Sequence, residues 1–189
     1  MKRKFKLYLA HSLETRKEIR EIELDIEKDF DIELYNPFYD TKRHDVKEID
    51  AGRQSRWDFD LKACEGIVDT DLNAIDECDG IIAIFLDSAS IGTCLEIGYA
   101  RQTGKLIFFI SEKYYNHPWI RVYCDYRFKT IDEFKMFLKY YKFNRFVFNL
   151  NKKLKVIKSS YMILKIGITK LVSKIHRKKK SINIETVGK

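Results

Sequence analysis

One carboxylate stands in an unusual place for a surface acid. Glu96 lies between the apolar residues Leu95 and Ile97 and follows a run of small residues, 87–94. If a helix begins near residues 92–93, this carboxylate lies in its first turn, where the helix dipole favours the ionised form by about 0.3–1 kcal/mol. A fixed, ionised carboxylate is a credible nucleophile toward an electrophilic sugar carbon. The alternative is an acid that only stabilises the start of the helix.

The elements that would position this carboxylate alternate between strands and helices. Apolar runs of strand length are separated by stretches in which apolar residues recur at helical spacing. Such alternation predicts an α/β fold, here a doubly wound, mainly parallel five-stranded sheet with helices on both faces. Ligands of such sheets bind beyond the carboxyl ends of the strands, where the loop 86–92 lies.

The expected elements are read directly from these patterns. We expect strands at 5–10, 32–35, 80–86 and 105–111, with a short fifth strand after residue 125. Helices are expected at 13–30, 57–78 and 93–103, and a last one after Thr130, its expected N-cap, with Glu133 at the third helical position. In the second helix the expected inward-facing residues are Leu61, Ile67, Leu72 and Ile75.

Composition and cysteine spacing favour a globular protein of a reducing compartment. Apolar residues make up 45% and charged residues 34% of the chain, which is ordinary for a globular domain. The four cysteines stand singly and the histidines are not clustered, so we expect no zinc site, no disulfide framework, no cofactor and a cytoplasmic location. The apolar stretch at the N-terminus is too short for a signal peptide, and no run reaches the roughly 18 apolar residues of a membrane span.

Positive charge is concentrated at the C-terminus. Residues 151–189 contain eleven lysines and one arginine against one glutamate, a net charge of +11, which leaves −3 for the rest of a chain whose total is +8. Apolar residues recur over 154–175 at alternating spacings of three and four, as in an amphipathic helix. We expect an α/β domain over 1–145 and a basic helical extension over 146–189. The extension would pair with another subunit, lie on an anionic surface, or pack on its own domain.

The segment "DLNAIDECDGIIAIFLDSASIGTCLEIGYARQTGK" (71–105) resembles the nucleoside 2-deoxyribosyltransferases and the related 5′-monophosphate N-glycosidases. The family pattern joins a tyrosine in the first strand, an acid that opens "DLN", and a turn of small residues that leads to E-[LIV]-G. The resemblance extends over roughly residues 5–140. It implies an enzyme that cleaves the N-glycosidic bond of a 2′-deoxynucleoside or its 5′-monophosphate and passes the sugar to another nucleobase or to water. It also implies a homo-oligomer, a dimer or larger.

The resemblance assigns roles to three residues. Glu96 would attack the anomeric carbon and form a glycosyl-enzyme ester, Asp71 would help hold the sugar and that carboxylate, and Tyr8 would donate a hydrogen bond that orients Glu96. This is two-step retaining chemistry. The alternatives are a solvated helix residue for Asp71 and an ordinary packed strand residue for Tyr8.

Two departures from the family pattern concern the substrate. The transferases carry an aspartate six residues before the nucleophile, whereas this chain has Ser90, which is more like the monophosphate N-glycosidases. The resemblance therefore implies that Ser88 and Ser90, beside the small residue Gly92, receive a phosphate at the helix N-terminus, with Arg16 as a weaker candidate. Serines that only satisfy the local backbone are the alternative.

The second departure follows the first strand. Ala10 and His11 stand where the family has glycines, so these two residues are expected to line the sugar pocket. His11 is either a proton donor or a structural side chain. The family also places a residue near the sugar 5′ group from its last strand, often in a neighbouring subunit, and the nearest matches are Asp125 and Tyr126.

The polar stretch 36–56 has weak periodicity and is expected to form a long loop that covers the base. Ordinary packing within the loop is the alternative. The candidate contacts are the rings of Phe38, Tyr39 and Trp57, which could stack on a base, and the side chains of Asn36 and Asp40, which could bind its polar edges.

Two other classes of function stay open at this point. A nucleotide-binding module that kept the pocket and lost turnover would fit the missing aspartate and glycines. Hydrolysis of a dinucleotide such as NAD by the same carboxylate is a weaker alternative, because the sequence has no Gly-x-Gly-x-x-Gly motif.

Overall fold

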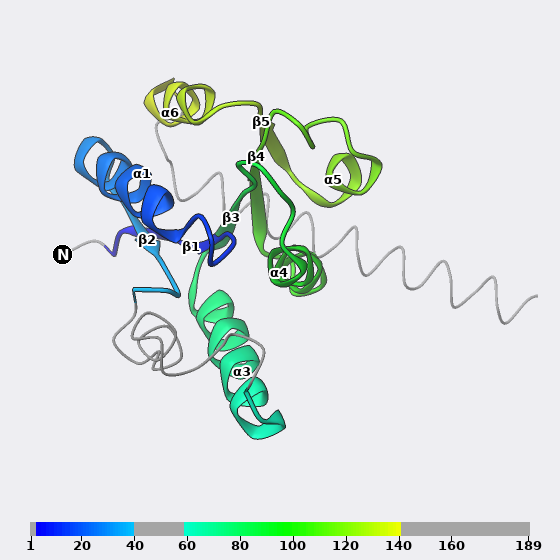
Figure 1. Ribbon diagram of the computed structural model, residues 1–189. Helices are drawn as coiled ribbons and strands as arrows, with labels where there is room; N and C mark the ends of the chain where they lie inside the picture. The colour runs from blue at the N-terminus through cyan, green and yellow to red at the C-terminus, as the bar shows by residue number, and fades with distance from the viewer. Residues whose placement is uncertain (1–2, 40–58, 141–189) are drawn as a thin grey trace, which may run out of the picture. The chain divides into compact units, whose positions relative to one another are not determined.

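Five strands form one sheet in which every neighbouring pair runs parallel. A computed structural model describes residues 3–39 and 59–140, and within them the strand order is β2-β1-β3-β4-β5 (Figure 1). The predicted doubly wound α/β fold is confirmed. The strands are β1 (Phe5–Ala10), β2 (Ile32–Tyr35), β3 (Gly80–Ile84), β4 (Leu106–Ile110) and β5 (Tyr126–Phe128).

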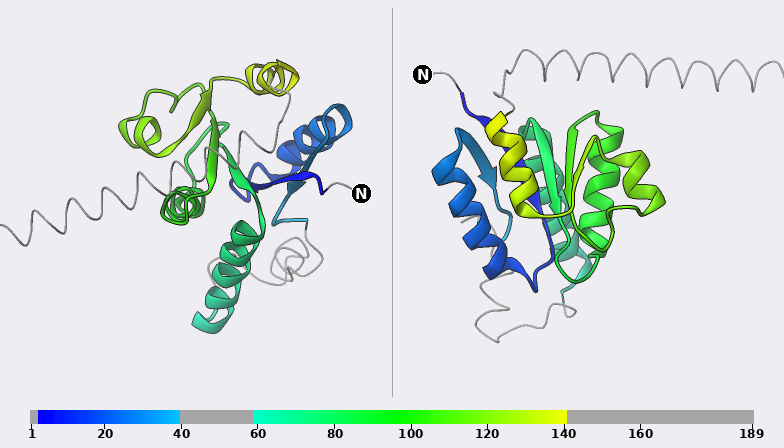
Figure 2. Two further views of the ribbon diagram at one scale, coloured as in Figure 1. Left: turned by 180° about the vertical axis from the view of Figure 1, so that it is seen from behind. Right: turned by 90° about the horizontal axis from the view of Figure 1, so that it is seen from above.

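Helices cover both faces of this sheet (Figure 2). On one face lie α1 (Arg16–Asp29) and α6 (Ile131–Tyr140), which are joined by an ion pair between Asp25 and Lys135. On the other face lie α3 (Leu61–Glu77), α4 (Ile91–Gln102) and α5 (Pro118–Tyr123). Their buried side chains form one apolar cluster with alternate residues of the strands. The layers therefore follow from the two-residue alternation of each strand.

The central strand β3 is buried along its whole length, as expected for a parallel strand covered on both faces. Tyr8 of β1 pairs with Ile81 and Ala10 with Ala83, and all four face α3, α4 and α5. Gly80 begins the strand where β4 comes close, since a Cβ atom there would lie 2.5 Å from the Leu106 carbonyl oxygen. Only glycine fits this approach without a shift of the backbone.

Two helices differ from the expected ones in ways that bear on the site. α4 begins at Ile91 with Ser90 as its N-cap, so Glu96 is the sixth helical residue and lies outside the first turn. In α3 the buried residues are Ala74 and Ile75, close to its C-terminal end. The prediction that Leu61 faces inward is wrong, because this side chain is 75% exposed. The first half of α3 extends past the layer that buries its second half (Figure 1).

One helix was not expected and one helix start was correctly predicted. α5 has only six residues, too few for apolar periodicity, and its local signal is Pro118 at the first helical position.

Before α6, the Thr130 hydroxyl accepts a hydrogen bond from the Glu133 N–H at 3.2 Å. The Glu133 carboxylate reaches back to the Lys129 N–H at 2.7 Å. This confirms the predicted cap.

Several expectations lie outside the described residues. They are the loop over 40–56 with Asp40, the ring of Trp57, the amphipathic pattern over 154–175 and the domain boundary at 145–146, all of which stay predictions. Within the described ranges, no helix combines the length and apolar character needed to span a membrane.

Candidate active site

Tyr8 and Glu96 form a direct hydrogen bond. The Tyr8 hydroxyl of β1 donates to Glu96 Oε1 of α4 over 2.7 Å. Tyr8 is fully buried, and its ring stacks on Tyr35 of the neighbouring strand at 5.9 Å between centroids. Because the ring is buried and stacked, the position of the hydroxyl oxygen is fixed, and its hydrogen bond orients the carboxylate. Hydrogen bonds to an ionised carboxylate are about twice as strong as those between neutral groups.

The Glu96 carboxylate points into the protein. The buried stripe of α4 consists of Thr93, Ile97 and Ala100, and Glu96 lies on the flank of this stripe. Its second oxygen, Oε2, has less than 1 Å² exposed. An acid between two apolar neighbours is therefore explained by its position beside the sheet, where Tyr8 meets it.

The predicted role of the helix dipole is corrected by this geometry. Glu96 lies six residues after the N-cap Ser90, and the first turn of α4 contains no acid. Because the effect of the dipole falls off within the first turn, the helix start contributes little to this carboxylate. The Tyr8 hydroxyl donates a hydrogen bond to this carboxylate, which favours its ionised form.

The start of α4 presents small and polar residues. Ser90 is the N-cap but makes no side-chain capping hydrogen bond, and Ser88 is exposed in the loop before it. Gly92 is exposed, and a Cβ atom there would meet only the Ser90 hydroxyl at 3.8 Å. The Ser90 hydroxyl therefore does not cap the helix.

His11 is held in a buried polar network at the end of β1. Its Nε2 lies 3.2 Å from Asn36 Oδ1 and its Nδ1 lies 3.0 Å from the Ser12 carbonyl oxygen. Asn36 in turn donates through Nδ2 to Glu23 Oε2 at 2.6 Å. Burial lowers the pKa of His11, although its two hydrogen bonds act in the opposite direction. Both ring nitrogens lie within hydrogen-bond distance of protein oxygens, which supports the structural alternative for His11.

Glu23 was missed in the sequence because charged residues alternate with apolar ones along the helix that contains it. It is 2% exposed and is paired with Arg20 as well as with Asn36. Burial raises the pKa of this carboxyl, and the contacts with Asn36 and Arg20 oppose that increase. The signal in the sequence was its position, since Glu23 falls between Ile19 and Ile26 on the buried stripe.

The remaining candidates lie around these groups. Asp71 lies in the second half of α3 and is half-buried. Ala10 is the last residue of β1 and is fully buried, and the ring of Phe38 contacts His11 edge to face at 4.9 Å. Ala10, His11 and Phe38 therefore meet where β1 and β2 end, as expected for one wall of a pocket at the carboxyl end of a parallel sheet.

Asp125 and Tyr126 are not brought to the Tyr8–Glu96 pair within one chain. Asp125 accepts a hydrogen bond from the Ile107 N–H at 2.9 Å and lies 3.6 Å from Arg101 of α4. Arg101 and Glu96 leave this helix about 140° apart, given about 100° per residue. The ring of Tyr126 stacks on Phe108 at 5.4 Å, on the sheet face that α6 covers. Their expected contact with substrate stays a prediction.

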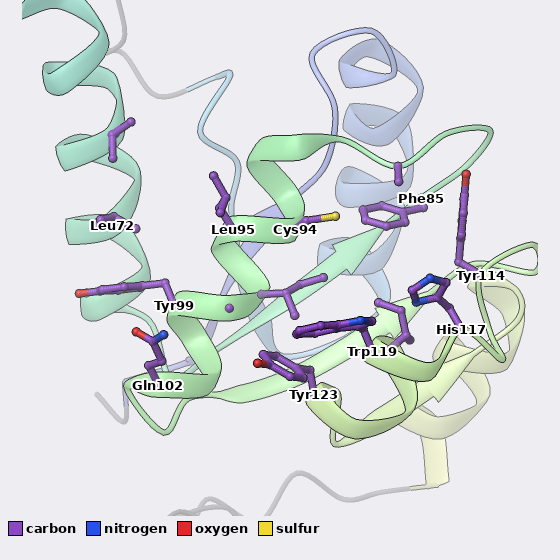
Figure 3. A pocket seen from close by; sticks show the side chains of 15 residues that line it. Leu72, Phe85, Cys94, Leu95, Tyr99, Gln102, Tyr114, His117, Trp119 and Tyr123 are labelled. Atoms are coloured by element: carbon purple, nitrogen blue, oxygen red, sulfur yellow. The ribbon is translucent and has the colours of Figure 1, made fainter. Parts of the chain in front are cut away.

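A cavity of about 680 Å³ opens beside α4 (Figure 3). It does not include Glu96 or Tyr8, and its lining is almost wholly apolar. Partial burial raises the pKa of the Cys94 thiol at its edge, and the charge of Glu96 raises it further, so this thiol stays protonated. We call this cavity the apolar groove; it is lined by Val68, Leu72, Phe85, Ala89, Cys94, Leu95, Ile97, Gly98, Tyr99, Gln102, Tyr114, His117, Trp119, Ile120 and Tyr123.

The lining of the apolar groove includes no carboxylate, and the sequence had not indicated this groove. Leu95 is 68% and Trp119 65% exposed, which is unusual for side chains of this size. The signal was available as the cluster of aromatic residues from Tyr114 to Tyr123. Among residues 3–39 and 59–140, no group of three His, Cys, Asp or Glu side chains is placed to hold a metal ion.

Comparisons with known proteins identify the family and the fold of the chain. The chain matches the family model of nucleoside 2-deoxyribosyltransferase over residues 7–160. A similar solved structure is the 2-deoxyribosyltransferase of the psychrotolerant bacterium Bacillus psychrosaccharolyticus, with a TM-score of 0.51 and 16% identity over 73% of this chain and 93% of that chain. The CMP N-glycosidase of Clostridium botulinum matches with a TM-score of 0.45 and 22% identity over 72% of this chain and 99% of that chain.

None of the curated proteins compared with the chain matches it. The structure from Bacillus psychrosaccharolyticus shares its fold at 16% identity, and the family model covers most of the sequence, including both partners of the Tyr8–Glu96 hydrogen bond. The chain belongs to the nucleoside 2-deoxyribosyltransferase family and is an enzyme of the transferase and N-glycosidase type that acts on nucleosides or nucleotides.

Proposed function

We propose that the protein cleaves the N-glycosidic bond of a 2′-deoxynucleoside or its 5′-monophosphate with Glu96 as the nucleophile. The observation that carries this proposal is the 2.7 Å hydrogen bond by which the buried Tyr8 holds the Glu96 carboxylate. A Glu96 oxygen bonds to C1′ while the bond from C1′ to the base nitrogen breaks, and its electron pair leaves with the base, which takes up a proton. Water or a second base then attacks C1′ and releases the carboxylate.

Asp71 is the second acid in this proposal. Its place on α3, the helix next to α4, is consistent with a carboxylate that binds a sugar hydroxyl beside the nucleophile. Asp71→Asn is expected to raise KM and lower kcat, since both binding and orientation of the sugar depend on it.

The N-terminus of α4 favours the 5′-monophosphate as substrate and water as acceptor. Ser90 stands where a transferase has an aspartate, and its hydroxyl makes no capping bond within the helix. Free backbone N–H groups and the positive end of the dipole make such a helix start suitable for a phosphate. A strict 5′-monophosphate N-glycosidase is therefore the second candidate function.

The test compares two reactions by chromatography of the released base. The protein is incubated with each 2′-deoxynucleoside plus a different free base, and separately with each 2′-deoxynucleoside 5′-monophosphate alone. A new nucleoside indicates transfer, and free base from the nucleotide indicates hydrolysis. Glu96→Gln keeps the shape of the side chain and removes the nucleophile, so it should abolish both products.

Two results would contradict the proposal. If Glu96→Gln releases base as fast as the wild-type protein, another residue is the nucleophile. If the ligands stabilise the fold against heat while neither assay yields a product, the protein is a nucleotide-binding module without turnover.

We further propose that a second copy of the chain covers the apolar groove. Large exposed apolar side chains gather there from three helices, with Val68 on α3, Leu95 on α4 and Trp119 on α5. Leu95→Glu should then reduce the mass measured by light scattering after gel filtration. Met136→Glu is the control, because Met136 is also exposed but lies on α6, on the opposite face of the sheet. An unchanged mass in Leu95→Glu would refute the interface.

The basic extension and the location of the protein complete the proposal. Cys64, Cys78, Cys94 and Cys124 form no disulfide, which is consistent with a cytoplasmic protein. The excess of lysine over 151–189 fits contact with an anionic surface or a neighbouring subunit. Deletion of residues 150–189 should lower either binding to anionic vesicles or the oligomer size. If neither changes, the extension packs on its own domain.

A further inference from the structure

Thr93 carries a buried hydroxyl without a partner. Its side chain is 1% exposed, and among the described residues its Oγ1 has no hydrogen-bond partner. Buried polar groups in proteins are nearly always paired, because leaving one unpaired costs folding free energy. A buried hydroxyl without a hydrogen-bond partner in the helix that carries Glu96 therefore calls for a reason.

Other threonines of the same chain show the ordinary arrangement. In helices the threonine hydroxyl usually bonds to a backbone carbonyl three or four residues earlier. The Thr70 hydroxyl donates to the Gly66 carbonyl at 2.7 Å, and the Thr103 hydroxyl to the Tyr99 carbonyl at 3.0 Å. Thr93 is the third residue of α4, so the carbonyls that precede it belong to the loop and the N-cap. Its hydroxyl stays available for a group from outside the chain.

The position of Thr93 points to the sugar. It lies three residues before Glu96, and side chains at this spacing are neighbours on one helix face, with Cβ atoms about 5–6 Å apart. It also lies three residues after Ser90, the N-cap where a 5′-phosphate is proposed to bind. On the sheet face that α4 covers, β1 and β3 end in the small side chains of Ala10 and Ala83. Thr93 is thus midway between the groups proposed for C1′ and for the phosphate.

We propose that Thr93 is a substrate-binding residue whose hydroxyl bonds to the 5′ oxygen of the pentose, as a hydroxyl or as its phosphate ester. This inference rests on the proposed function, since it takes Glu96 as the group that faces C1′. Without a partner, the hydroxyl lowers the free energy of unfolding of the ligand-free protein, and it gains a hydrogen-bond partner when substrate binds.

The test measures binding and stability in one set of variants. Thr93→Val removes the hydroxyl at constant shape, Thr93→Ser keeps it, and Thr103→Val is the matched control in the same helix. Dissociation constants for the four 2′-deoxynucleosides and their 5′-monophosphates are measured by calorimetry in a Glu96→Gln background, where no turnover occurs. Melting temperatures are measured without ligand.

Thr93→Val is expected to bind about fivefold more weakly, the effect of one neutral hydrogen bond, and Thr93→Ser to restore binding. Without ligand, Thr93→Val should melt about 2–4 °C higher than its parent, whereas Thr103→Val should not. Weaker binding of both ligand types identifies the 5′ oxygen itself, and weaker binding of the monophosphates alone identifies the phosphate.

Unchanged binding of every ligand to Thr93→Val would overturn the inference. A lower melting temperature of Thr93→Val without ligand would also overturn it, because it would show that an ordered water or a structural contact already bonds to the hydroxyl. The two proposals fail separately. If the wild-type protein releases base and Thr93→Val binds every ligand as before, the proposed function holds and the role of Thr93 is refuted. If binding depends on Thr93 but no base is released, the role of Thr93 holds and the proposed function is refuted.

Discussion

The Tyr8 hydroxyl lies 2.7 Å from Glu96 Oε1, although the two residues are 88 positions apart in the chain. One comes from the first strand and the other from the helix that follows the third strand, and β1 and β3 are neighbours in the sheet. The chemistry proposed for this protein depends on that adjacency. It supplies a buried carboxylate whose orientation is set by a neighbouring strand.

Tyr8→Phe should lower kcat/KM for base release by about 10–100-fold, the effect of a hydrogen bond to a charged group worth about 1.5–3 kcal/mol. The ring and its stacking on Tyr35 are kept, so the fold should change little. Tyr99→Phe is the matched control, because the Tyr99 hydroxyl also donates to a carboxylate, Asp76, over 2.7 Å, on an exposed surface. Equal rates for Tyr8→Phe and the wild-type protein would show that Glu96 is oriented by another group.

His11 should make stability depend on pH in the mildly acidic range. Burial lowers its pKa in the folded protein below the ordinary value of 6.5, so the unfolded chain binds a proton first as the pH falls. The free energy of unfolding therefore decreases from about pH 6.5 down to the pKa of the folded state, with a slope of at most about 1.4 kcal/mol per pH unit.

The measurement is urea unfolding between pH 8 and pH 5, compared with His11→Gln. The variant should be less dependent on pH over this window. Glu23 acts in the opposite direction, because burial raises its pKa above 4.5 in the folded state. It is present in both proteins, so the difference between their curves isolates His11. Parallel curves would mean that His11 is protonated to the same extent in the folded and unfolded states.

Lys105→Met should destabilise the fold by about 2–4 kcal/mol while leaving the activity of the folded fraction intact. Lys105 is 6% exposed, and its Nζ donates to the carbonyls of Asp76 at 2.5 Å and Cys78 at 2.7 Å, at the C-terminal end of α3. Methionine fills the space but leaves both carbonyls unpaired. Lys113→Met, at an exposed site, is the control for urea unfolding, and similar midpoints for the two variants would contradict this role.

Gly80→Ala and Gly66→Ala should change stability in opposite directions. At Gly80 the new Cβ would lie 2.5 Å from the Leu106 carbonyl oxygen, so the strands must separate, at a cost of about 1–3 kcal/mol. At Gly66, in an exposed part of α3, nothing lies within 4 Å, and alanine should stabilise the helix by about 0.5–1 kcal/mol. Thermal unfolding of both variants measures these two changes in stability. A stabilised Gly80→Ala would show that β3 and β4 are less closely paired.

The order of strands and helices could be predicted because each is encoded locally. The continuous apolar run that forms β3 and the cap formed by Thr130 and Glu133 are patterns within a few residues. The prediction failed where the pattern was short or one-sided. α5 has too few residues to show a helical repeat of apolar residues. Leu61 belongs to the apolar stripe of α3 in the sequence, but it lies in the part of this helix that none of the other described elements covers closely enough to bury it.

The sequence by itself determined the alternating α/β architecture, the family, and the choice of Glu96 and Tyr8 as candidates, since periodicity and short motifs survive in a linear chain. Only the tertiary structure decided which of these groups meet. It placed Tyr8 against Glu96, paired Asp125 with Arg101 and enclosed His11 with Asn36 and Glu23. Within residues 3–39 and 59–140 it also left the Thr93 hydroxyl without a hydrogen-bond partner. The physical reason is that strand register and helix rotation set the direction of each side chain, and both are fixed by packing between segments far apart in sequence.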